Sequence, residues 1–234
     1  IDATIRLSPD RIALYNYAYV PWISPWQKQM PEEAMPAGET KFQIFRTAIR
    51  KLLEAGYLYI GMDHFAKPGD ELARALAAGT LHRNFMGYTT RAGQAELYGF
   101  GLSAISGLDG YYNQNLKKLS TYTAAVEAGT LPTWRGYALT QDDRIRRRAI
   151  QRILCQGELD YQALATEFGI HVPSYLADAL PEMLPLEEDG LLAWTDRGFR
   201  LTPLGRIFAR NVAMPFDAHL RREQSEKPLF SKTL

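Results

Sequence analysis

The chain has 234 residues, of which 46% are hydrophobic and 23% charged, and its net charge is +1. This length allows one large domain or two modest ones. No stretch approaches the roughly 18 apolar residues of a membrane span, so we expect no membrane partner. The near-zero charge removes any long-range attraction to nucleic acid. The first residues show no apolar signal segment, and the start at Ile1 rather than Met suggests a fragment or a processed piece.

Cysteine and histidine content limits the possible chemistry. Cys155 is the sole cysteine, which excludes an internal disulfide and an intrachain cysteine site of three or four ligands for zinc or iron–sulfur. A reducing, cytoplasmic setting is the natural interpretation. Cys155 follows Ile153 and Leu154 on an apolar helical face, where a buried structural thiol is expected. His171 and His219 stand alone in the sequence and favour surface or capping roles.

The first part of the chain has the rhythm of a parallel α/β unit, in which strands and helices alternate. Buried strands are expected over 11–17 and 57–62, and a glycine-containing strand over 98–105. The segment 21–38 is rich in proline and tryptophan and predicts an ordered loop. Periodic apolar residues predict helices over 39–55, 70–78 and 115–128.

The character changes at Thr140, an N-cap residue followed by two acids in the first helical turn. Further helical patterns cover 161–168, 174–184 and 203–214, with a hairpin around residues 196–198. We therefore divide the chain into domains 1–138 and 139–234, the second helical and winged-helix-like. Residues 140–234 carry 13 Lys/Arg and 14 Asp/Glu, and this balance argues against a nucleic-acid-binding winged helix.

The motif GMDHFAKP directly follows the strand expected over 57–62. In parallel α/β folds this end of a strand is where ligands bind. Asp63 and His64 are a candidate proton-transfer pair, in which the carboxylate fixes the tautomer of the imidazole. A helix cap with a hydrogen-bonded turn explains the motif equally well. Adjacent residues at the end of a strand point in opposite directions, which weakens the case for a dyad.

A second motif, HRNFMGYTT, gathers polar and aromatic residues around a glycine. Arg83 can pair with a carboxylate, Tyr88 offers a flat face, and Asn84 adds an amide between them, so the motif suits an anionic, planar ligand. An ordinary polar loop is the competing interpretation. The later FGLSAIS segment lacks a phosphate-loop pattern and is better explained as small residues lining a cofactor cavity. The arginine-rich start of the helix after Thr140 predicts a solvated face.

Several segments together resemble one family in order and spacing. They are SPDRIALYNYAYVP, AGYLYIGMDHFAKPGDELA, GTLHRNFMGYTT, GFGLSAIS, YNQNLKKLSTY, WRGYALTQDDRIRR and GRIFARNVAMPFDAHL. The chain is similar to the oxygen-independent coproporphyrinogen III oxidases, which are radical S-adenosylmethionine enzymes. The resemblance implies an α/β fold: the C-terminal part of a partial (β/α)6 barrel, followed by the mostly helical domain.

The resemblance also implies a reaction. The family decarboxylates two propionates of coproporphyrinogen III to vinyl groups, which gives protoporphyrinogen IX in haem biosynthesis. It uses a [4Fe-4S] cluster, S-adenosylmethionine and an electron donor, and a monomer is expected. The cluster cysteines of the family lie in an N-terminal half that these 234 residues do not contain. We therefore expect the chain alone to be inactive, with neither a catalytic residue nor a metal ligand assigned within it.

Carried over by motif, Ala18 and Ile105 match positions that contact S-adenosylmethionine in the family. The family gives no role to Asp63, His64, Arg83 or Tyr88. Three departures put fine substrate geometry in doubt: Met86 replaces the usual Gln, Tyr19 a His and Tyr15 a Phe. An alternative function is a non-catalytic, haem-binding protein on the same scaffold, which holds a tetrapyrrole through Arg83 and the loop of Trp22 and Trp26.

Overall fold

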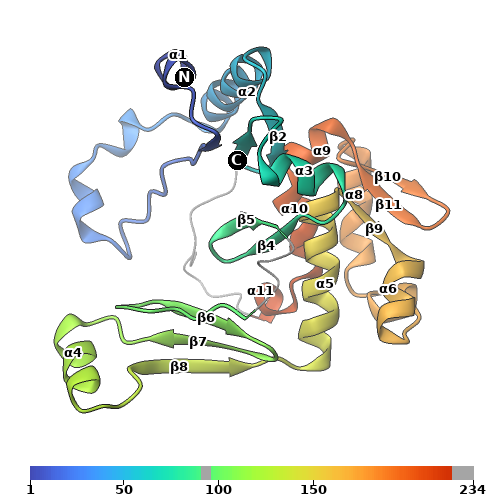
Figure 1. The fold of residues 1–234 in the computed structure, drawn as a ribbon. Coiled ribbons are helices and arrows are strands. Elements are labelled where there is room, and N and C mark those ends of the chain that lie inside the picture. Colours follow the sequence, from blue (N-terminus) through green and yellow to red (C-terminus); the bar gives the residue numbers. More distant parts are fainter. Residues whose placement is uncertain (91–95, 223–234) are drawn as a thin grey trace.

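The computed structural model describes residues 1–90 and 96–222. The N-terminal region opens with a short helix and strand, followed by a long segment with two 3-10 turns and then by a helix packed on a small sheet (Figure 1). Its elements are α1 (Asp2–Leu7), β1 (Arg11–Ala13), η1 (Pro25–Gln29), η2 (Glu32–Ala34), α2 (Gly38–Glu54), β2 (Leu58–Gly61), β3 (His64–Ala66) and α3 (Glu71–Ala77).

The predicted helix over 39–55 is confirmed as α2, which buries Phe45, Ala48 and Leu52 on one face. The predicted helix over 70–78 is confirmed as α3. Its N-cap carboxylate, Asp70, accepts a hydrogen bond from the amide of Leu72, which satisfies one of the free N–H groups at the helix start.

The predicted parallel strand over 57–62 is wrong in its pairing. Strand β2 pairs antiparallel with β3, and β1 pairs antiparallel with the other edge of β3. The reason is local: Met62 adopts φ 51°, and the two residues Met62 and Asp63 return the chain directly into β3. A two-residue hairpin needs no crossover helix. The predicted buried strand over 11–17 is shorter than expected, and Arg11 and Ala13 are exposed.

The middle of the chain forms two antiparallel units: the hairpin of β4 (His82–Asn84) and β5 (Gly87–Thr89), and a meander of β6 (Ile105–Leu108), β7 (Tyr111–Asn115) and β8 (Thr133–Ala138). Helix α4 (Leu119–Glu127) connects β7 to β8. We call residues 105–138 the arm, because Figure 1 shows it extending away from the other elements. Neither α4 nor β8 contains a buried residue.

In this region one predicted strand is misplaced, and one predicted helix is confirmed with a later start. The strand expected over 98–105 starts only at Ile105, because Gly101 (φ 100°) and Ser103 (φ 57°) turn the chain before it. The helix expected over 115–128 starts at Leu119, because Asn115 ends strand β7. The Asn115 amide instead donates to the carbonyls of Gly99 and Gly101, at 3.3 and 2.9 Å. Asn115 therefore holds the turn that precedes β6.

The C-terminal region surrounds one apolar core with short helices and a three-stranded sheet. Its elements are α5 (Gln141–Gln156), β9 (Glu158–Asp160), α6 (Tyr161–Phe168), α7 (Val172–Tyr175), η4 (Leu180–Glu182), α8 (Met183–Glu188), β10 (Leu192–Thr195), β11 (Gly198–Leu201), α9 (Pro203–Ile207), α10 (Ala209–Ala213), η5 (Met214–Phe216) and α11 (Ala218–Arg222). The predicted N-cap at Thr140, the helix over 161–168 and the hairpin are confirmed. The helices expected over 174–184 and 203–214 are each broken into shorter pieces.

Helix α5 joins the two regions. Its residues Ile145, Ala149 and Ile153 lie in the C-terminal core, whereas Cys155 packs with Ile60 of β2 and with other buried residues of the first region. Cys155 is 2% exposed, so the predicted buried thiol is confirmed. Among the described residues, no helix is both long enough and apolar enough to cross a bilayer.

Candidate functional site: an arginine-lined cavity

A cavity of about 970 Å³ lies between the β4–β5 hairpin, the arm and helix α5. In Figure 1 the hairpin is above the arm, and α5 and α11 border the space between them. Arg83, Asn84 and Ile105, three of the residues singled out from the sequence, line this cavity. Ala18, Asp63, His64 and Tyr88 do not line it.

Three guanidinium groups line the cavity without a carboxylate within salt-bridge distance among the described residues. They belong to Arg83, Arg135 and Arg147. The four acids of the same wall are already engaged. Asp109 pairs with Arg144, and Asp143 accepts hydrogen bonds from His219 and Tyr137. Glu96 accepts from the Tyr98 hydroxyl, and Asp217 accepts from the amides of His219 and Leu220. Unpaired cations beside engaged acids leave the wall suited to an anionic ligand.

The prediction of a solvated arginine face on α5 holds for Arg144 and Arg147, which are exposed, but not for Arg146, whose side chain is only 11% exposed. Arg144, Arg146, Arg148 and Arg152 each contact a carboxylate at 2.6–3.5 Å. Arg147 instead donates to the phenolic oxygen of Tyr112, over 2.9 Å. The sequence analysis therefore missed Arg147 as a site residue, and it missed Arg135 and Tyr112 of the arm as well. No local sequence signal distinguishes Arg147 from its neighbours.

Arg83 lies on β4 directly opposite Tyr88 of β5. Its guanidinium carbon is 6.0 Å from the centroid of the Tyr88 ring. The Nε atom of Arg83 is buried and has no hydrogen-bond partner among the described residues, which is costly unless a ligand or water occupies the position. The Arg83 carbonyl is held by Gln151 of α5, over 3.0 Å. The backbone of Arg83 is thus fixed while its side chain keeps a free donor.

His82, next to Arg83, is a further lining residue that the sequence analysis missed. Gln151 Nε2 lies 3.3 Å from His82 Nε2 and can only donate, so this imidazole nitrogen accepts. Burial lowers the pKa of His82, and the nearby cations of Arg147 and Arg148 lower it further. Both effects favour the neutral form of the His82 imidazole.

Asp63 and His64 form the predicted pair, but outside the cavity. His64 Nδ1 lies 2.8 Å from Asp63 Oδ1, and both side chains are more than four-fifths buried. The argument that adjacent strand residues point apart does not apply, because Asp63 lies in the β2–β3 turn and only His64 belongs to the strand. The ring of His64 packs edge-on against Tyr88, with centroids 5.2 Å apart, and more distantly against Tyr15, at 6.2 Å.

Tyr88 connects this pair to α5. Its hydroxyl donates to the carbonyl of Leu154 over 2.8 Å, and burial raises its pKa well above the ordinary value. Gly61 must be glycine here, because a Cβ atom would overlap the Tyr88 hydroxyl. Tyr88 is thus a buried structural contact whose ring supports both His64 and Arg83.

The remaining predicted residues take less central positions. Asn84 shapes the hairpin turn, since its Oδ1 accepts from the amide of Met86 over 2.9 Å. Met86 itself is 74% exposed. Ala18 lies in the exposed segment before α2, and its carbonyl accepts from Gln27. Ala18 and Ile105 do not line a common cavity in this structure.

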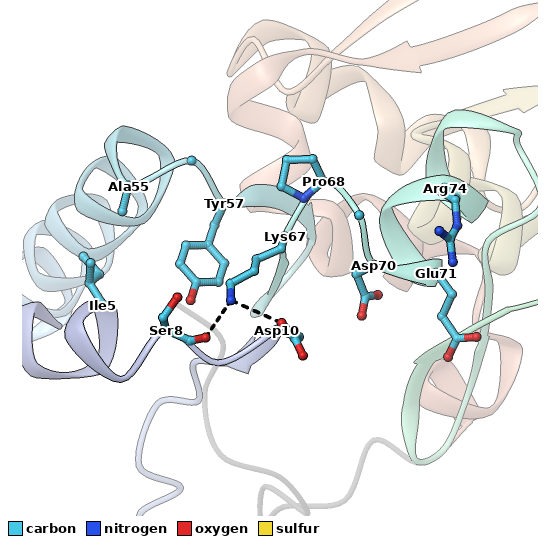
Figure 2. Close-up of a pocket in the computed structure, with 12 residues that line it drawn as sticks. Ile5, Ser8, Asp10, Ala55, Tyr57, Lys67, Pro68, Asp70, Glu71 and Arg74 are labelled. Carbon is cyan, nitrogen blue, oxygen red and sulfur yellow. Dashed lines mark hydrogen bonds and ion pairs between the residues drawn. The ribbon is translucent and has the colours of Figure 1, made fainter.

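A second depression, of about 790 Å³, lies between α1, β3 and α3 (Figure 2). Most of its charges satisfy one another, the exception among the described residues being Arg74. Lys67 donates to the Ser8 carbonyl at 2.7 Å and contacts Asp10 at 3.2 Å, and Asp70 pairs with Arg11 at 2.8 Å. With a single cation left without a partner, this depression is a weaker candidate for a ligand site than the arginine-lined cavity.

The described residues contain no group of three or more His, Cys, Asp or Glu that could hold a metal ion. Burial raises the pKa of the Cys155 thiol to about 12, so this thiol stays protonated and is a poor metal ligand. The residues present therefore do not fit an iron–sulfur cluster.

Comparison with known proteins agrees with the fold. The family model "HemN C-terminal domain" matches residues 139–208. The oxygen-independent coproporphyrinogen III oxidase of Synechocystis is 45% identical over 99% of this chain and 50% of its own length. The protein of that name from Thermostichus vulcanus is 43% identical over 100% of this chain and 71% of its own length.

A solved structure of the Escherichia coli coproporphyrinogen III oxidase HemN, described as a radical SAM enzyme, superposes with a TM-score of 0.88. The match is 40% identical and covers 93% of this chain and 50% of that one. The α/β fold is therefore that of a HemN-type protein. The chain belongs to the oxygen-independent coproporphyrinogen III oxidase family. It spans about half the length of the first curated relatives it matches.

Proposed function

We propose that this chain is part of an enzyme that oxidatively decarboxylates two propionates of coproporphyrinogen III to vinyl groups, giving protoporphyrinogen IX in haem biosynthesis. Family membership supports the reaction, because relatives at 38–45% identity carry the oxidase name. The observation that carries the proposal is the cavity of about 970 Å³ lined by Arg83, Arg135 and Arg147 without carboxylate partners. A flat substrate that carries several carboxylates complements such a wall.

In this proposal the chain supplies substrate binding and shape. The arginines hold propionate carboxylates, and Phe85 and Tyr112, which line the same cavity, offer aromatic surface to the macrocycle. The cavity has the size range of a cofactor or ligand pocket.

A [4Fe-4S] cluster and S-adenosylmethionine belong to the rest of the proposed enzyme, where they generate the radical that starts the oxidation. The cluster ligands are absent from this chain, whose single cysteine lies in the core. We infer that residues 1–234 alone bind no cluster and are inactive. We also place Ala18 and Ile105 near S-adenosylmethionine, on the resemblance alone. An electron donor, a cytoplasmic location and a monomeric state complete the proposal.

The architecture of the whole protein is part of the same proposal. We infer a partial (β/α)6 barrel that residues 1–138 complete, followed by a winged-helix-like domain in residues 139–234. The superposition on HemN supports the arrangement as a whole. The order α5, α6, α7 and then the β10–β11 hairpin, which pairs with β9, supports the winged-helix comparison.

Anaerobic turnover tests the proposal. The full-length protein, reconstituted with iron and sulfide and supplied with S-adenosylmethionine and a reductant, is expected to convert coproporphyrinogen III into protoporphyrinogen IX. Product and released CO2 are measured by chromatography and isotope counting. Tight coproporphyrinogen binding without CO2 release would instead support the non-catalytic, tetrapyrrole-binding alternative. Residues 1–234 alone serve as the control and are expected to show no iron–sulfur absorption after the same treatment.

A further inference from the structure

Arg147 and Tyr112 form a pre-arranged donor pair in the cavity wall. Arg147 Nη1 donates to the Tyr112 hydroxyl oxygen over 2.9 Å, and the guanidinium carbon lies 5.8 Å from the centroid of the Tyr112 ring. No carboxylate of the described residues lies within salt-bridge distance of Arg147, although every other arginine of α5 has one. The contact with Tyr112 therefore orients the guanidinium group of Arg147 but does not neutralise its positive charge.

Tyr112 is held in place by the arm. It occupies the central strand β7, opposite Gly107 of β6 and Tyr137 of β8. A Cβ atom on Gly107 would lie 3.2 Å from the Tyr112 ring, so glycine leaves room for the ring. Because the Tyr112 oxygen accepts from Arg147, its own proton remains available to a second acceptor. No such acceptor occurs among the described residues.

Arg135 belongs to the same cavity wall, on the neighbouring strand β8. Its Nε donates to Gln114 over 3.3 Å, and its guanidinium carbon lies 4.5 Å from the centroid of the Trp134 ring. Stacking on an aromatic ring orients a guanidinium without cancelling its charge. The arm thus contributes a second oriented cation.

We propose that Arg147 and Tyr112 bind one propionate carboxylate of the tetrapyrrole and so set its position in the cavity, with Arg135 adding charge to the same subsite. This inference rests on the proposed function. Arg147 and Tyr112 both line the cavity and contact each other, so a carboxylate placed beside them can accept from both donors at once with its two oxygens.

The test titrates the full-length protein with coproporphyrin III, the air-stable oxidised form of the substrate, and follows porphyrin fluorescence. Arg147→Gln is expected to weaken binding by about 10- to 100-fold, because it removes a charged hydrogen-bond donor. Tyr112→Phe is expected to weaken it by about 3- to 10-fold, for the loss of one neutral donor. Arg148→Gln is the matched control on the same helix, since Arg148 pairs with Glu167 and neither residue lines the cavity.

A second ligand separates carboxylate binding from a structural role. The tetra-amide of coproporphyrin III has the same ring and no carboxylates, so Arg147→Gln is expected to change its affinity less than twofold. Equal weakening for both ligands, or wild-type affinity for coproporphyrin III in Arg147→Gln, would overturn the subsite while leaving the proposed function intact. Failure of the wild-type protein to bind coproporphyrin III at all would overturn the proposed function as well.

Discussion

The carboxylate of Asp63 fixes the imidazole of His64, with Asp63 Oδ1 2.8 Å from His64 Nδ1 where the two-residue β2–β3 turn enters β3. Since the carboxylate can only accept, Nδ1 carries the proton and Nε2 is the acceptor nitrogen in the neutral ring. A histidine held in one tautomer is suited to a single hydrogen-bonding role. The structure thus assigns the neutral His64 ring to the tautomer with its proton on Nδ1, although the Asp63–His64 pair lies outside the arginine-lined cavity.

Nitrogen NMR tests this arrangement directly, because the chain has only four histidines. In the neutral ring, His64 is expected to show a protonated Nδ1 and a bare Nε2. Asp63→Asn is expected to weaken the preference, because an amide can donate to the ring as well as accept from it. The other three histidines serve as internal controls, and their tautomers should stay unchanged. A wild-type His64 with its proton on Nε2 would contradict the assignment.

Gly87 is the second position that defines the surroundings of His64. Its φ is 132°, and an added Cβ atom would lie 3.1 Å from His64 Nε2. Gly87→Ala is therefore expected to lower the free energy of unfolding by about 1–3 kcal/mol and to displace the imidazole. Gly69→Ala is the matched control, since nothing lies within 4 Å of its Cβ position and its φ is not in the left-handed region. Equal stability of both variants would contradict the packing described here.

Cys155 predicts how stability depends on alkaline pH. Burial raises the pKa of its thiol from 9.0 to about 12, so the unfolded chain loses this proton before the folded chain does. The folded state is thus favoured below pH 9, and this contribution falls as the pH rises toward 12, by about 1.4 kcal/mol per pH unit.

Chemical denaturation at a series of pH values measures this slope, and Cys155→Ala is expected to remove it between pH 9 and 10. The comparison uses the pH dependence of the free energy of unfolding and not its absolute value. The cavity left by the smaller side chain lowers that free energy equally at every pH. The same slope in both proteins would show that Cys155 already ionises in the folded state.

Asp143 anchors the start of α5 and the end of the chain described here. Burial disfavours its charged form, but hydrogen bonds from Thr140, His219 and Tyr137 outweigh burial and hold the carboxyl pKa well below its ordinary value of 3.8. Stability from this group is therefore present above pH 3.8 and is lost as the pH falls below it.

Asp143→Ala is expected to lower the free energy of unfolding by about 1–2 kcal/mol at neutral pH, because the capping box is lost. It should also reduce the acid sensitivity of the chain. Asp109→Ala, which removes a side chain that is 87% exposed, is expected to change stability by under about 0.5 kcal/mol. A similar effect of both substitutions in thermal unfolding would show that Asp143 adds nothing specific.

Apolar spacing, helix caps and turn residues in the sequence predicted those helices and hairpins whose formation depends on neighbouring residues. Helix α2 follows from its apolar spacing, α5 from the cap at Thr140, and the β10–β11 hairpin from the turn between them. The pairing of β2 was not predictable in the same way. Its reversal depends on Met62 in a left-handed conformation, which no residue preference of methionine indicates.

The site was only partly predictable for a related reason. Arg83 was recognised because its motif is compact, whereas Arg147 looks the same in sequence as the arginines beside it. What distinguishes Arg147 is Tyr112, 35 residues earlier, which the fold of the arm brings against α5. Only the tertiary structure shows which arginines lack a carboxylate.

The central claim is that the cavity between β4, the arm and α5 holds the carboxylates of a tetrapyrrole. Its most direct test is a crystal structure of the full-length protein with coproporphyrin III bound. The account predicts the macrocycle in this cavity, with propionate oxygens about 3 Å from nitrogens of Arg147 or Arg83. A porphyrin bound elsewhere, with these arginines free of contact to it, would contradict the account.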